Sequence, residues 1–155
     1  MTGRAAKTRP STAADARSRL ASARQFLDAL DALEASGTAI SNDVLASNAI
    51  LAAIAAADAI CGARRQLQSA SDNHNDAADL LRSIDKRHGD DLAKALAHKN
   101  AAAYSTRQTT DAEAKTCRRV AERLFEAAQQ AVQGAPNPPH DQKPRRKEAP
   151  PPGVT

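Results

Sequence analysis

Aromatic side chains are nearly absent from this 155-residue chain, which has no tryptophan, one tyrosine and two phenylalanines. Alanine supplies 37 residues instead, so a core must be built from alanine, leucine, isoleucine and valine. The alternation of β-branched and aromatic residues that is typical of strands appears nowhere. Because alanine has the highest helix propensity and lets helices approach closely, the composition predicts an all-α fold.

Proline is missing between Pro10 and the C-terminal segment GAPNPPHDQKPRRKEAPPPGVT, which holds seven of the eight prolines. That segment is polar and charged, and the opening MTGRAAKTRP has nothing to bury. Neither end has the composition of a packed core. We therefore expect a disordered N-terminal arm over 1–11, a helical bundle domain over 12–133, and a disordered, basic, proline-rich tail over 134–155.

An excess of positive charge is confined to the two ends of the chain. The net charge is +4, but residues 1–10 carry +3 and residues 134–155 carry +2, which leaves −1 for residues 11–133. A basic groove on the domain is therefore not implied by the totals. Nucleic acid could instead be bound by the tail through Lys143, Arg145, Arg146 and Lys147, although solvated basic tails are common.

The first twenty residues contain no apolar stretch, so we expect no signal peptide, and the chain shows no long hydrophobic run. Its longest apolar stretch, Ala49–Ala63, is interrupted by Asp58, whereas a membrane span needs about 20 strongly apolar residues. We expect a soluble, cytoplasmic protein with no membrane partner. Cys61 and Cys117 fall on apolar faces and are predicted to be buried, reduced thiols. No cluster of cysteine and histidine predicts a metal site, and no cofactor is predicted.

Five amphipathic segments predict an up-and-down bundle of five helices. We expect them over residues 13–35, 42–66, 73–84, 90–104 and 110–134. Thr12 with Asp15 and Thr110 with Glu113 have the spacing of capping boxes at the first and last helices. The second segment is apolar nearly all round, which is typical of a central, buried helix. The segment DKRHGD is expected to break the chain between the third and fourth helices.

Two charges stand on helix faces that are otherwise apolar. Lys99 continues the stripe of Leu92 and Leu96, and Asp58 stands between Ile54 and Cys61. A buried charge without a partner is costly, so one interpretation is that Asp58 and Lys99 pair in the interior. The other is that each lies at a helix rim and is solvated. His74, in the first turn of the third segment, is interpreted as a residue that bonds to the backbone rather than as a catalytic group.

The order of these segments resembles the HEPN superfamily over about residues 12–133. The resemblance rests on AILAAIAAADAIC in the central helix, on NHNDAADLL in the short helix, on LAKALAHKNAAAYS, and on TTDAEAKTCRRVAERLFEAAQQ in the closing helix. It implies a small helical domain that forms a homodimer. Many members of that superfamily are ribonucleases with the active site at the dimer seam, often toxins paired with an antitoxin or a nucleotidyltransferase.

The superfamily signature is an arginine followed, after four to six residues, by a histidine. Here Lys99 stands in the arginine position and Tyr104 where the histidine could be. Lysine lacks the bidentate fork of arginine, and tyrosine, with a pKa near 10, transfers protons poorly at neutral pH. The site therefore looks degenerate. Arg82 and His88 match the spacing too, but at the end of the third helix, where we interpret the match as chance.

The sequence thus leaves three hypotheses for function. The first is a bacterial HEPN-like domain, non-catalytic or weakly active, that self-associates and binds protein or RNA, in a toxin-antitoxin or defence-type system. The second is an active, metal-independent endoribonuclease that uses Lys99 and Tyr104, or Arg82 and His88. The third is a nucleic-acid-binding protein that uses its basic tail. RNA cleavage separates the first two, and salt-dependent binding lost on tail deletion supports the third.

Overall fold

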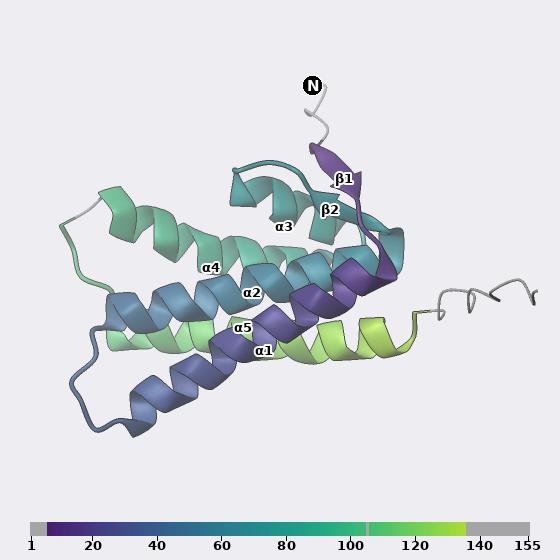
Figure 1. Cartoon of the computed structure of the whole chain (residues 1–155). Helices are drawn as coiled ribbons and strands as arrows, with labels where there is room; N and C mark the ends of the chain where they lie inside the picture. The colour runs from purple at the N-terminus through teal and green to yellow at the C-terminus, as the bar shows by residue number, and fades with distance from the viewer. Residues whose placement is uncertain (1–5, 105, 136–155) are drawn as a thin grey trace, which may run out of the picture.

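The chain folds as a bundle of five helices, which confirms the predicted all-α class. The computed structural model describes residues 6–104 and 106–135, the side chains of residues 100–104 excepted. The helices are α1 (Ala13–Ala35), α2 (Asn42–Arg65), α3 (His74–Arg82), α4 (Lys86–Tyr104) and α5 (Asp111–Gln133). Figure 1 shows α1 crossing α2 and α5, with the short α3 beside one end of α4.

Side-chain caps fix where the helices begin. Thr12 accepts a hydrogen bond from the Asp15 N–H, and the Asp15 carboxylate accepts one from the Thr12 N–H. Thr110 and Glu113 form the same reciprocal pair at the start of α5. These bonds satisfy N–H groups that have no partner within the helix. Both predicted capping boxes are therefore confirmed.

The core is organised around α2, as the sequence predicts. Every residue from Ala52 to Gly62 is buried, and α2 packs mainly against α1 and α5. Among the described helices, α2 is the one long and apolar enough to cross a membrane, but 72% of its most apolar stretch is buried inside the bundle. That burial is typical of the core helix of a soluble protein.

A two-stranded ribbon corrects the predicted N-terminal arm. Residues Thr8–Pro10 form β1, which pairs antiparallel with β2 (Leu67–Ser69) just after α2. The following Ser11 is buried and donates its N–H to the Gln66 carbonyl at 2.9 Å. Strand pairing uses backbone groups, so it needs no apolar side chains in the arm. Residues 1–5 and 136–155 lie outside the described residues, so disorder there stays a prediction.

The turn between α3 and α4 is shorter than the sequence predicts. The α4 helix begins at Lys86 rather than near residue 90, because the Asp85 carboxylate accepts the His88 N–H at 3.0 Å and caps it. Gly89 therefore lies inside α4 instead of ending a loop. A Cβ atom at Gly89 would stand 2.6 Å from the Arg82 backbone nitrogen, so glycine permits the close approach of α3 and α4.

Candidate functional site

Asp58 is the buried charge of the core, and its partner is Arg19 of α1. Its carboxylate lies 2.9 Å from Arg19 Nη2 and accepts a hydrogen bond from Arg19 Nε at 3.0 Å. Gln68 of β2 donates to the same oxygen at 3.3 Å. Burial raises the pKa of Asp58, and the Arg19 charge opposes that rise. The predicted pair of Asp58 with Lys99 is therefore wrong, since Arg19 occupies the carboxylate.

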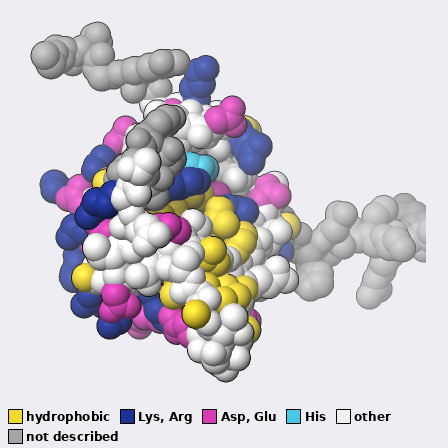
Figure 2. Space-filling view, turned by 90° about the vertical axis from the view of Figure 1, so that its left-hand side faces the viewer, with side chains coloured by type: hydrophobic (Ala, Val, Ile, Leu, Met, Phe, Trp, Pro, Cys, Tyr) yellow, Lys and Arg dark blue, Asp and Glu magenta, His cyan; other side chains and the backbone are white. Residues whose placement is uncertain are grey.

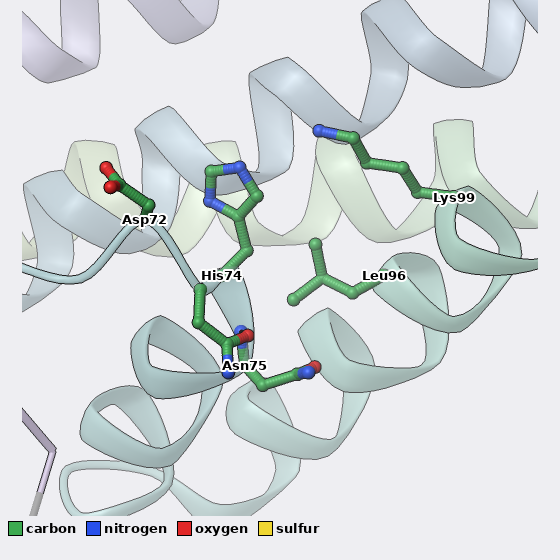
Figure 3. Close-up of a pocket in the computed structure, with 6 residues that line it drawn as sticks. Asp72, His74, Asn75, Leu96 and Lys99 are labelled. Carbon is green, nitrogen blue, oxygen red and sulfur yellow. The ribbon is translucent and has the colours of Figure 1, made fainter. Parts of the chain in front are cut away.

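Lys99 is exposed on α4, and among the described residues no carboxylate lies within 4.0 Å of its amine. It borders a cavity of about 110 Å³ between α4 and the first turn of α3. The other lining residues are Asp72, Asn73, His74, Asn75 and Leu96. Figure 3 shows the Lys99 side chain extending past Leu96 toward the side of the cavity where the His74 ring lies.

Lys99 is close enough to His74 to affect the pKa of the imidazole. Burial lowers the pKa of His74, and the Lys99 ammonium lowers it further, whereas Asp58 and Asp72 oppose this shift. The N-terminus of α3 is capped without the imidazole, because Asn73 Oδ1 accepts the Asn75 N–H at 3.1 Å. His74 is thus a partly buried imidazole at a cavity wall, a placement that the sequence interpretation missed.

A second cavity lies on the other side of Lys99, between α2 and α4. Its volume is about 340 Å³, and it is lined by Asp43, Ala46, Ser47, Ile50, His98, Lys99 and Thr109. The Asp43 carboxylate accepts the Thr109 N–H at 3.0 Å, and bonding to Thr109 lowers the pKa of Asp43. His98 Nδ1 stands 3.8 Å from Glu113. Lys99 therefore lines two cavities, which differ in volume and in the residues that surround them.

The other site residues predicted from the sequence do not lie beside Lys99 in the described part of the structure. Arg82 is occupied by Asp79 at 2.6 Å and Asp90 at 2.8 Å, so its guanidinium is committed to ion pairs. His88 lies 3.9 Å from Asp85 and lines a separate cavity at the far end of α2. The Tyr104 side chain lies outside the described residues, as do the tail residues Lys143, Arg145, Arg146 and Lys147.

The cysteines take the environment that the sequence predicts. Cys61 and Cys117 are free and buried. Burial raises the pKa of the Cys61 thiol to about 12 and that of Cys117 to about 11. Neither is a reactive thiolate at neutral pH. Within the described ranges, no group of three or more His, Cys, Asp or Glu side chains is arranged to hold a metal ion.

An exposed apolar face adjoins the second cavity. Val44 and Leu51 of α2 are 44% and 39% exposed, and they are the large hydrophobic residues that the described part of the chain exposes. Seven residues apart, they lie on one face of the helix. Ser47, which lines the second cavity, stands between them in sequence. Figure 2 looks onto the end of the bundle where α2 begins. It shows hydrophobic side chains gathered on the surface that faces the viewer.

Comparison of the chain with protein-family models, with curated proteins and with solved structures found no match.

Proposed function

We propose that this chain is a HEPN-like helical domain of the cytoplasm that acts through self-association and partner binding rather than through catalysis. The observation that carries the proposal is the exposed pair Val44 and Leu51 in the first half of a helix whose stretch from Ala52 to Gly62 is the buried centre of the bundle. Exposed large apolar side chains on one face of a helix commonly mark a surface that another molecule covers. Residues 11–133 have a net charge of −1, so two domains repel each other little.

A second copy of the chain is the occupant we propose for this face. A two-fold axis brings the same patch of both copies together, so one apolar surface covers itself without a separate complementary surface. The resemblance to HEPN domains supports the same homodimer. An antitoxin, a nucleotidyltransferase or an RNA would then bind the assembled pair.

Sedimentation velocity at micromolar concentration tests the self-association directly. We expect the unmodified chain to sediment as a dimer and Leu51→Asp to sediment as a monomer, because a carboxylate at the centre of the interface would be desolvated. Ala97→Asp adds the same charge at an exposed position of α4 and should leave the dimer intact. A monomer at every concentration, or equal effects of the two substitutions, would contradict the proposal.

The second candidate function is a metal-independent ribonuclease, and the placement of Lys99 favours it. Its amine is not engaged by Asp58, and an imidazole, His74, stands across a cavity. A lysine can stabilise charge on a phosphate while an imidazole moves a proton. The binding proposal predicts that purified protein leaves RNA uncut. RNA cleavage that Lys99→Ala and His74→Ala both abolish would make the ribonuclease the function.

A further inference from the structure

A third cavity, of about 380 Å³, lies where α2 and α5 end and α4 begins. Figure 1 shows α2 and α5 side by side, with their C-terminal ends on the right of the view. The lining combines apolar side chains with charged and polar ones, among them Ile60, Ile84, Ala127, Arg64, Asp85 and His88. A volume of roughly 300 to 1,000 Å³ and an apolar lining with a few polar groups are typical of small-molecule pockets.

Two opposite charges line this cavity without neutralising each other. The Asp85 carboxylate accepts the His88 N–H at 3.0 Å, and this bond lowers the pKa of Asp85, so the group is ionised at neutral pH. Its other oxygen lies 3.9 Å from His88 Nε2, beyond hydrogen-bond distance. Among the described residues, no carboxylate, Asp85 included, lies within 4.0 Å of the Arg64 guanidinium. Both charges are therefore available to a ligand.

The helix ends favour a ligand that carries a positive charge as well as a negative one. Arg64 lies in the last turn of α2, and Gln130 and Ala131 lie in the last turn of α5. The C-terminal end of a helix carries a partial negative charge, which attracts cations. A simple carboxylate would meet Arg64 but also these ends and Asp85. A zwitterion satisfies the guanidinium and the carboxylate together.

We propose that this cavity binds a free aliphatic α-amino acid, with its carboxylate at Arg64, its ammonium at Asp85 and its side chain against Ile60 and Ile84. The arginine fork is suited to a carboxylate, and the ionised Asp85 has an oxygen to accept an ammonium N–H. Ile60 is buried and Ile84 is half-buried, so they offer the branched side chain an apolar wall.

This inference goes beyond the proposed function and is independent of it. Arg64 follows Leu51 by 13 residues on α2, which corresponds to about 20 Å along the helix axis. The cavity also shares no lining residue with the two cavities beside Lys99. Binding here therefore requires neither the exposed face of α2 nor any group of the candidate ribonuclease site.

Isothermal titration calorimetry of the full chain at neutral pH with L-leucine, L-isoleucine and L-valine tests the inference. We expect at least one of them to bind. Three analogues each lack one part of the ligand: the N-acetyl derivative has no ammonium, the amide has no carboxylate, and glycine has no aliphatic side chain. Each should bind about tenfold more weakly than the parent amino acid, the equivalent of about 1.4 kcal/mol.

Two substitutions assign the ligand groups to their partners. Arg64→Gln should weaken the amino acid about tenfold but leave its amide unchanged, because the amide has no carboxylate to lose contact. Asp85→Asn keeps a side chain that can cap α4, and it should weaken the amino acid about tenfold but not the N-acetyl derivative. As controls, Arg17→Gln and Asp28→Asn make the same charge changes at exposed positions of α1 and should change nothing.

Three results would overturn the amino-acid site. The first is no binding of any of the three amino acids at millimolar concentration. The second is glycine or the amide binding as tightly as the parent amino acid. The third is equal weakening by Arg64→Gln and Arg17→Gln. Sedimentation of the same samples reports self-association separately, so a failure of this site is distinguishable from a failure of the proposed dimer.

Discussion

Replacing Arg19 with alanine should destabilise the fold by about 3 kcal/mol at neutral pH, because it leaves a buried carboxylate without its countercharge. Asp58 is only 7% exposed, and after the substitution its remaining side-chain partner would be Gln68. Urea denaturation measures the loss. As a matched control, Arg17→Ala removes an arginine from an exposed position of the same helix and should cost less than about 0.5 kcal/mol.

The loss in Arg19→Ala should depend on pH in one direction. The pKa of Asp58 is raised in the folded state, and without Arg19 it rises further. The folded state then binds more protons than the unfolded state, so stability falls as the pH rises from the unfolded pKa of about 3.8 through the folded value. The deficit should therefore be largest at neutral pH and shrink toward about pH 4.

Two further variants decide between Arg19 and Lys99 as the partner of Asp58. Adding Asp58→Asn to Arg19→Ala removes the stranded charge and should restore part of the stability at pH 7. Lys99→Ala should cost less than about 0.5 kcal/mol, since Lys99 is exposed. If Lys99→Ala instead cost about 3 kcal/mol and Arg19→Ala were neutral, the pairing seen in the structure would be refuted.

Gly89→Ala should destabilise the protein by about 2 kcal/mol, although helix propensity alone favours alanine by about 1 kcal/mol. A Cβ atom at this position would lie 2.6 Å from the Arg82 nitrogen and 2.7 Å from its Cα, so the backbones of α3 and α4 must separate. Thermal unfolding monitored by circular dichroism gives the difference.

Gly134→Ala is the control for this effect of crowding. Gly134 ends α5 with a φ of −82°, and a Cβ atom there would meet nothing closer than 3.4 Å. Alanine adopts that conformation without strain and should be neutral or slightly stabilising. Equal behaviour of the two variants would mean that the turn between α3 and α4 is looser than described.

Helix positions could be predicted largely from local chemistry. The bounds of α1 agree with the capping signal at Thr12 and the apolar stripe, and α5 agrees with the signal at Thr110. The start of α4 was not predicted in this way, because glycine in DKRHGD reads as a helix breaker. The local signal that decides the start is Asp85, which caps the helix, and only the need for glycine at position 89, which comes from crowding against Arg82, leaves no mark in a local pattern.

Contacts between distant segments were harder to predict, as Asp58 shows. In the sequence, Lys99 stands on an apolar face and is therefore the evident candidate for its partner, whereas Arg19 does not stand out among the other arginines of α1. The connection from α1 to α2 does contain a signal. In an antiparallel helical hairpin, residues equally far from the turn lie at the same height, and the midpoint of 19 and 58 falls between Thr38 and Ala39 in that turn.

The candidate cavity between Lys99 and His74 depends on the packing of α4 against the start of α3. The sequence singled out Lys99 but assigned His74 a backbone role, since nothing in either segment states that α3 and α4 fold back on each other at this height. The ribbon of β1 and β2 was missed for a related reason. Three-residue strands leave no detectable alternation, and backbone pairing is independent of composition.

Chemical cross-linking at position 51 tests the central claim, self-association through the exposed face of α2, most directly. Cys61 and Cys117 are buried with raised thiol pKa values and should react slowly, so an introduced thiol can be targeted alone. With a short bifunctional thiol reagent, we predict that Leu51→Cys forms a covalent dimer and that Glu126→Cys, exposed on α5, stays monomeric. No cross-link at position 51, or equal cross-linking at both positions, would contradict the account.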